Sequence, residues 1–82
     1  MYNKNNKEIM VVIGRLWRDS HGNTYHTSEV ISKDCTDKSD ITYGYGNQFI
    51  ATAREMVEAK GLEWDNYHII NRQVIVNRKG DL

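Results

Sequence analysis

The sequence predicts one small α+β domain, in which a single amphipathic helix packs on one face of a small antiparallel sheet. The segment 48–60 repeats apolar residues at helical spacing, and the segments around it are rich in β-branched and aromatic residues. The chain has 82 residues, enough for one domain and too few for two. A helix with one apolar stripe buries it against one layer, so we expect the order β-β-(β)-α-β.

The first strand is expected over Glu8–Arg18, which is dominated by β-branched, aromatic and aliphatic side chains. Apolar residues fall on both faces of its first half, which favours a central position in the sheet. Gly14 interrupts this run and indicates a bulge or a close approach of another part of the chain. The polar residues 1–7 that precede the strand are expected to form a flexible N-terminus.

A hairpin is expected at Gly22-Asn23, because glycine at the first central position suits a type II′ turn. The returning strand then covers residues 24–33. A two-residue loop places Trp17 opposite Ser28, on the same face as His26. A four-residue loop keeps these faces, whereas a three-residue loop swaps them.

Between this hairpin and the helix, we expect a polar loop over Asp34–Asp40 and a short third strand over Ile41–Tyr43. The segment Tyr43-Gly44-Tyr45-Gly46 is interpreted as a strand-to-helix corner, because its glycines permit positive φ angles. A phosphate-binding loop is the less favoured interpretation, since no Gly-Lys-Ser/Thr follows the glycines.

The one clear helix is expected over residues 48–60, with Asn47 as its N-cap and Gly61 as the residue that ends it. Its apolar stripe consists of Phe49, Ile50, Ala53, Met56 and Val57. After the helix, residues 67–70 and 73–77 are expected to be extended, with a kink or tight turn between them. The domain should therefore span residues 8–78, followed by a polar tail over residues 79–82.

Composition narrows the functional classes. Eleven basic residues offset eleven acidic ones, which argues against a strongly basic nucleic-acid binder. The single cysteine, Cys35, excludes an internal disulfide framework and fits a reducing compartment. The longest apolar run, Ile9–Ile13, is too short to span a membrane, and no secretory signal is visible. We therefore expect a cytoplasmic protein with no membrane partner.

Catalytic and metal-binding patterns are weak. The three histidines are not spaced like a zinc pair, and one cysteine does not complete a zinc site. The acidic residues of the segment 34–40 lack the glycine and the terminal glutamate of a calcium loop. No convincing nucleophile–base pair is present. We expect no enzyme, no metal and no cofactor.

Binding is better supported than catalysis. Residues 34–65 hold seven of the eleven acidic residues and three of the eleven basic ones, which suits a basic partner surface. Tryptophan and tyrosine are frequent in the energetic centres of protein interfaces. The residues that we expect to contact a partner are Trp17, Tyr25, His26, Tyr43, Tyr45 and Trp64.

Two motifs carry a resemblance. Gly22-Asn23-Thr24-Tyr25-His26, and Tyr43-Gly44-Tyr45-Gly46 followed by Gln48 and by Thr52-Ala53, resemble motifs of small uncharacterised proteins of tailed phages and mobile elements. The resemblance covers residues 9–61. It implies a phage context, in which small accessory proteins often bind and block a host factor. The prediction is a non-enzymatic accessory protein that binds a host macromolecule, most plausibly an inhibitor of a host defence system such as CRISPR.

Two alternatives stay open. The first is a small nucleic-acid-binding module, in which Trp17, Tyr25, Tyr43 and Tyr45 stack on bases beside nearby arginines. The second is a virion or assembly component that acts as a homo-oligomer through a free sheet edge.

Overall fold

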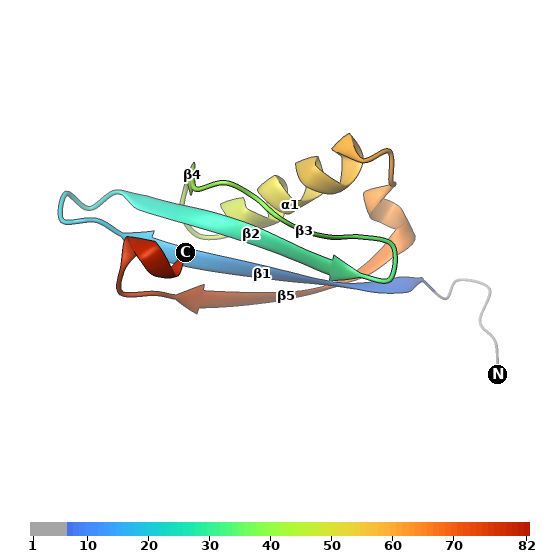
Figure 1. The fold of residues 1–82 in the computed structure, drawn as a ribbon, viewed down its shortest axis with the longest axis horizontal. Helices are drawn as coiled ribbons and strands as arrows, with labels where there is room; N and C mark the ends of the chain where they lie inside the picture. The colour runs from blue at the N-terminus through green and yellow to red at the C-terminus, as the bar shows by residue number, and fades with distance from the viewer. Residues whose placement is uncertain (1–6) are drawn as a thin grey trace.

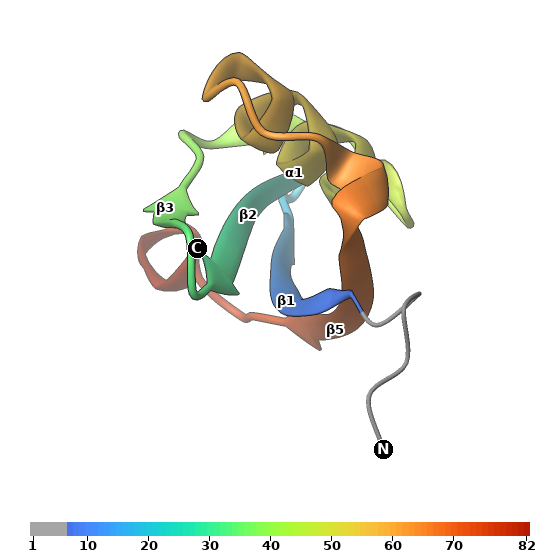
Figure 2. The same ribbon diagram turned by 90° about the vertical axis from the view of Figure 1, so that its right-hand side faces the viewer.

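The computed structural model describes residues 7–82, in which one sheet carries one α-helix along a single face (Figures 1 and 2). The elements are β1 Glu8–Arg18, β2 Thr24–Ser32, β3 Thr36–Lys38, β4 Thr42–Tyr43, α1 Gln48–Ala59, η1 Trp64–Asn66, β5 Tyr67–Ile75 and η2 Lys79–Asp81. The strand order is β3-β2-β1-β5, and β4 also pairs with β2. The predicted α+β class and the central position of β1 are confirmed. The predicted flexible N-terminus lies outside the described residues, apart from Lys7.

The sheet is mixed, so the expectation of a purely antiparallel sheet was wrong. β1 and β2 are antiparallel, but β1 and β5 are parallel, from Glu8 opposite Tyr67 to Leu16 opposite Ile75. The reason is that α1 runs back along the sheet and returns the chain to the end where β1 begins (Figure 1). β5 also runs without a break through Asn71-Arg72, where a kink or turn was expected, because β1 pairs with it along its whole length.

The β1–β2 hairpin does not have the predicted two-residue loop. Asp19 and Asn23 close the turn, with the Asp19 N–H donating to the Asn23 carbonyl at 2.8 Å, and Gly22 adopts a φ of 86°. This is the three-residue alternative, in which a glycine in the left-handed region follows a type I turn. The odd loop length swaps the faces, so Trp17 lies opposite Tyr25 and Leu16 lies opposite His26.

Two short strands and a bulge form the outer edge of β2. The predicted loop over residues 34–40 contains β3, which was missed because its three residues carry no apolar pattern. Lys38 pairs with Glu29, and Thr42 pairs with His26. Between these two pairs, the edge has three residues, 39–41, whereas β2 has only two, 27–28. This extra residue is a β-bulge, which re-aims the side chains that follow it.

The core lies between α1 and the facing side of β1 and β2. Its buried members are Met10, Val12, Leu16, Val30, Phe49, Ala53, Val57 and Tyr67. The predicted helical stripe is confirmed, because Ile50 and Met56 pack against the three buried helix residues. Gly61, at a φ of 80°, ends the helix as expected. Asn47 stands at the N-cap position, but its side chain makes no capping hydrogen bond.

Gly14 allows the helix to approach the sheet closely. A Cβ atom at Gly14 would overlap the aromatic ring of Phe49, so the ring lies directly on the backbone of β1. Of the two interpretations of Gly14, close approach is therefore correct. The buried Ser28 hydroxyl on β2 donates to the Phe49 carbonyl and fastens the first turn of α1 to the same region.

The C-terminal residues lie against the domain. The Val76 N–H donates to the Leu16 carbonyl at 2.8 Å, which extends the pairing of β5 with β1. Residues 79–82, predicted as a polar tail, contain the turn η2, and Lys38 Nζ donates to the Leu82 carbonyl oxygen at 3.0 Å. This contact holds the segment against β3.

We predict that Gly14→Ala lowers the free energy of unfolding by about 1–3 kcal/mol, because the added methyl group over-packs the Phe49 ring. Urea denaturation followed by circular dichroism would measure the change. Gly80→Ala is the matched control, since nothing lies within 4 Å of its added Cβ atom. An equal effect of the two substitutions would contradict the close packing at Gly14.

Candidate functional site

The structure brings three of the six predicted contact residues together. Trp17, Tyr25 and Tyr43 lie on the face of the sheet opposite α1, which we call the open face. Tyr45 lies on the helix side instead, in an apolar hollow of about 280 Å³ beside Leu16. Trp64 belongs to η1, at the end of the sheet away from the hairpin, and packs against the core (Figure 1).

Among the three rings of the open face, Tyr25 contacts both of the others. Trp17 and Tyr25 stack across the β1–β2 pair with ring centres 5.9 Å apart and planes 28° apart. Tyr43 on β4 meets Tyr25 edge to face, with ring centres 5.6 Å apart and planes at 74°. Offset stacking and edge-to-face contact are the favoured geometries of aromatic pairs. The rings therefore hold one another in a fixed cluster.

These rings line a hollow of about 440 Å³, which we call the aromatic hollow. It is lined by Trp17, Asp19, Tyr25, Ile41, Tyr43 and Lys79. Tyr43 is 65% exposed and Ile41 is 45% exposed, so apolar surface faces solvent here. A hollow of this size accommodates one large side chain of a partner.

Sequence reasoning missed three residues of the aromatic hollow. Asp19 was assigned to the turn, Ile41 to a short strand and Lys79 to a tail. Ile41 did carry a signal, because it is an aliphatic residue two positions before the predicted contact residue Tyr43, a spacing that places both on one face of a strand. Lys79 carried none, because it reaches the aromatic hollow through the return of the C-terminal segment, a contact distant in sequence.

Asp19 gives the aromatic hollow a fixed negative charge. Its Oδ1 accepts the backbone N–H groups of Asn23 and His21, each at 2.9 Å. The hydrogen bond from the Asn23 N–H is the main reason that the pKa of Asp19 lies below its ordinary value of 3.8. The carboxylate is therefore ionised at neutral pH and stabilises the turn next to Trp17.

His26 is a positioning residue rather than a contact surface. It is 1% exposed, and its Nδ1 lies 3.1 Å from the Gly44 carbonyl oxygen. Because that oxygen only accepts, Nδ1 carries the hydrogen. Nε2 lies 2.7 Å from Thr52 Oγ1 on α1. His26 thus ties the corner before the helix to both β2 and α1, and it offers no surface to a partner in this conformation.

The corner separates its two tyrosines. Gly44 has a φ of 145°, and a Cβ atom there would stand 3.0 Å from Gln48 Cβ. The chain can therefore turn tightly over the first turn of the helix. Tyr43 remains on the open face beside Tyr25, while Tyr45 reaches the helix side. The predicted corner is present, and it assigns the two rings to different surfaces.

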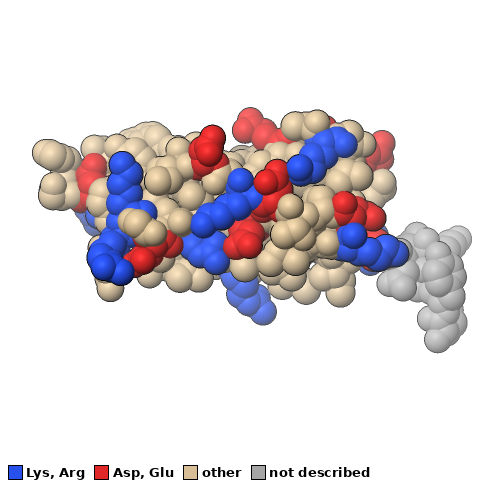
Figure 3. Space-filling view, in the orientation of Figure 1, with Lys and Arg blue, Asp and Glu red and all other residues tan. Residues whose placement is uncertain are grey.

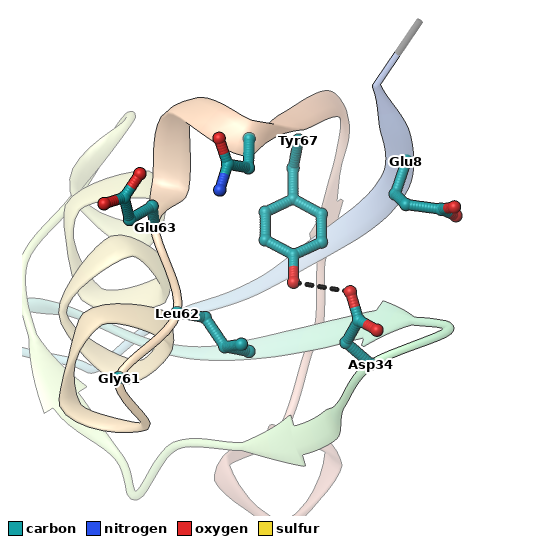
Figure 4. A pocket seen from close by; sticks show the side chains of 7 residues that line it. Glu8, Asp34, Gly61, Leu62, Glu63 and Tyr67 are labelled. Atoms are coloured by element: carbon teal, nitrogen blue, oxygen red, sulfur yellow. Dashed lines mark hydrogen bonds between the residues drawn. The ribbon is translucent and has the colours of Figure 1, made fainter.

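A second hollow, of about 480 Å³, lies beyond the C-terminal end of α1 (Figure 4). It is lined by Glu8, Asp34, Gly61, Leu62, Glu63, Asn66 and Tyr67. Tyr67 Oη donates to Asp34 Oδ2 at 2.8 Å across it. This hydrogen bond, with burial and the Asp34 charge, raises the pKa of Tyr67 to about 12. The hydroxyl is therefore engaged within the chain.

The surface charges are mixed. Figure 3 shows Lys and Arg interspersed with Asp and Glu over the face that it presents, with no broad area of one sign. Within the acidic middle segment, residues 34–65, Asp37 pairs with Lys60 at 2.9 Å and Glu58 pairs with Arg54 at 3.2 Å, so these two carboxylates already have cationic partners. On the open face, Arg15 pairs with Glu29 at 2.9 Å.

Two features are absent from the part of the chain that the structure describes. Among residues 7–82, no group of three or more His, Cys, Asp or Glu side chains is arranged to hold a metal ion. In the same range, no helix is both long and apolar enough to cross a membrane.

We predict that Tyr67→Phe makes stability less dependent on pH between about 10 and 12. In the native chain, the folded state keeps the Tyr67 phenol neutral up to about 12, whereas the unfolded chain ionises near 10. The stabilisation by the neutral phenol is therefore complete below pH 10 and is lost as the pH rises to about 12.

Urea unfolding at several alkaline pH values would measure this, together with phenolate absorbance. The native chain should show one late-ionising tyrosine that Tyr67→Phe lacks. Tyr45→Phe, at a residue that is 73% exposed, is the matched control and should still show the late-ionising tyrosine. A constant stability difference between the native chain and Tyr67→Phe from pH 10 to 12 would contradict the assignment.

Comparisons with protein-family models, curated proteins and solved structures found no match to this chain. The function must therefore be inferred from the chain's own residues. Among these, the aromatic hollow combines fixed rings, exposed apolar surface and a fixed charge.

Proposed function

We propose that this chain is a non-enzymatic binding protein that attaches to a partner protein through the aromatic hollow of the open face. The proposal rests on the packed aromatic rings of Trp17, Tyr25 and Tyr43, which line a hollow of about 440 Å³. Rigid aromatic side chains bury a large area while losing little conformational entropy, which is why they dominate binding energy at protein interfaces.

Charge favours a protein over a nucleic acid as the partner. A nucleic-acid surface needs unpaired cations that neutralise phosphates. Here Arg15 is already paired with Glu29, and the ionised Asp19 lines the aromatic hollow and repels phosphate. The only cationic side chain of the lining is Lys79. The chain carries no net charge, which also suits a protein partner better than a polyanion.

The resemblance to small phage proteins supplies the context of the proposal. Its motifs Gly22–His26 and Tyr43–Gly46 provide two of the three rings of the aromatic hollow. We extend the proposal accordingly: the partner is a host protein in the cytoplasm, and the chain blocks a component of a host defence system such as CRISPR. The chain would act by occupying a surface that its target needs.

A pull-down from host lysate, with and without nuclease, tests the class of partner. A near-stoichiometric host protein that survives nuclease treatment is the expected result. Recovery that collapses after nuclease treatment would favour the nucleic-acid alternative instead. Titration of the captured protein with the purified chain would then give the reference affinity for comparison with the variants.

We predict that Tyr43→Ala weakens binding of the captured protein by about tenfold or more, the loss of affinity that is typical when a hot-spot residue is truncated. Tyr43 is exposed on the open face, so its removal should leave the fold intact. Isothermal titration calorimetry would measure the affinity. Tyr45→Ala is the matched control, because Tyr45 is also largely exposed but lies on the helix side. Loss of binding in Tyr45→Ala alone would place the contact at the corner and reject the aromatic hollow.

A further inference from the structure

The two edges of the sheet differ in how they are protected. The edge beside β2 is formed by β3 and β4, of three and two residues, with a bulge between them. Asp37, Lys38 and Asp40 place charges along it. Short strands, bulges and charged side chains are the features that prevent an edge from pairing with another chain.

The β5 edge has fewer of these features. β5 is nine residues long, and among the described residues it pairs only with β1 (Figure 1). It contains no proline or bulge, and Arg72 is its only Lys, Arg, Asp or Glu residue. The outer N–H and C=O groups of such a strand form a template for one more strand.

The side chains of β5 are also uncovered. The helix packs over β1 and β2, and residues 71–75 are exposed on both faces of β5. Val74 is 44% exposed on the open face, and Ile75 is 68% exposed on the helix side. An added strand would therefore cover apolar side chains as well as pair with the backbone.

We propose that the β5 edge is the interface of a symmetric homodimer, in which the β5 strands of two copies pair antiparallel about a two-fold axis near Asn71. The axis stands perpendicular to the sheet, so both helices lie on the same side of one continuous sheet. An interface of this kind is isologous, because each copy contributes the same residues. The dimer does not depend on the proposed function of the aromatic hollow.

Two observations favour a second copy as the occupant. The chain has no net charge, so two copies do not repel each other overall. In the register centred on Asn71, no charged residue opposes a charged residue. Arg72 of one copy lies opposite Ile70 of the other, and Val74 lies opposite His68. Centring on Arg72 would place two guanidinium groups directly opposite each other, which is unfavourable.

Light scattering after size exclusion, over about a hundredfold range of concentration, tests the dimer. The native chain should shift from the monomer mass to twice that mass. Val74→Lys places a charge on the pairing edge and should raise the dissociation constant by about tenfold or more. Ile31→Lys is the matched control, because Ile31 is 39% exposed on the same face but lies on β2.

Cross-linking tests the register. Residues opposite each other in an antiparallel pair have Cα atoms about 4.5–5.5 Å apart, within reach of a disulfide. In a Cys35→Ser background, Asn71→Cys should form a covalent dimer on mild oxidation, and a reductant should reverse it. Glu55→Cys, at an exposed position of α1, is the control for random collision.

The proposal fails if the native chain remains a monomer at every concentration. It also fails if Val74→Lys and Ile31→Lys weaken the dimer equally, or if Asn71→Cys cross-links no faster than Glu55→Cys. Circular dichroism of each variant confirms that a lost dimer does not reflect a lost fold. None of these readouts requires the partner of the aromatic hollow, so the two proposals can fail separately.

Discussion

The contact between the Phe49 ring and the backbone of Gly14 is the constraint on which the rest of the structure depends. The core of this domain is thin, with eight buried apolar residues, and α1 covers most of it, with Leu62 and Trp64 packed beside the helix. A side chain at position 14 would lift the helix away from β1. Val12, Leu16 and Val30 would then lose the layer against which they are buried. The corner held by His26 and the bond from Ser28 fix the helix in the same position.

Local chemistry predicts the elements, and distant contacts decide how they are joined. The helical stripe from Phe49 to Val57 was predicted from its helical spacing, and the strand from Glu8 to Arg18 from its β-branched, aromatic and aliphatic residues. The hairpin was misassigned because Gly22-Asn23 fits two turn types, and the Asp19 carboxylate and the φ of Gly22 select the longer one. The parallel pairing of β5 with β1 could not be predicted from local sequence, because it depends on the direction in which α1 returns the chain.

The candidate site shows the same division. The sequence indicated aromatic residues as candidate contacts, but the faces of the strands decide which of them meet. His26 and Tyr25 are neighbours in one motif, yet His26 points into the core and Tyr25 points to the aromatic hollow. Had the loop been even in length, Trp17 and Tyr25 would have lain on opposite faces of the sheet. One residue in a turn thus determines whether the aromatic cluster exists at all.

The two proposed surfaces occupy different parts of the sheet, and their geometry has a joint consequence. The aromatic hollow is centred on β2 and β4, whereas the β5 edge lies on the other side of β1. A two-fold axis perpendicular to the sheet turns both open faces to the same side. The dimer would therefore present two aromatic hollows in one direction, separated by the paired β5 and β1 strands. A target that is itself two-fold symmetric would meet both at once, and the second contact would form at a high effective concentration. Weak binding at each aromatic hollow would then suffice for tight binding of the pair.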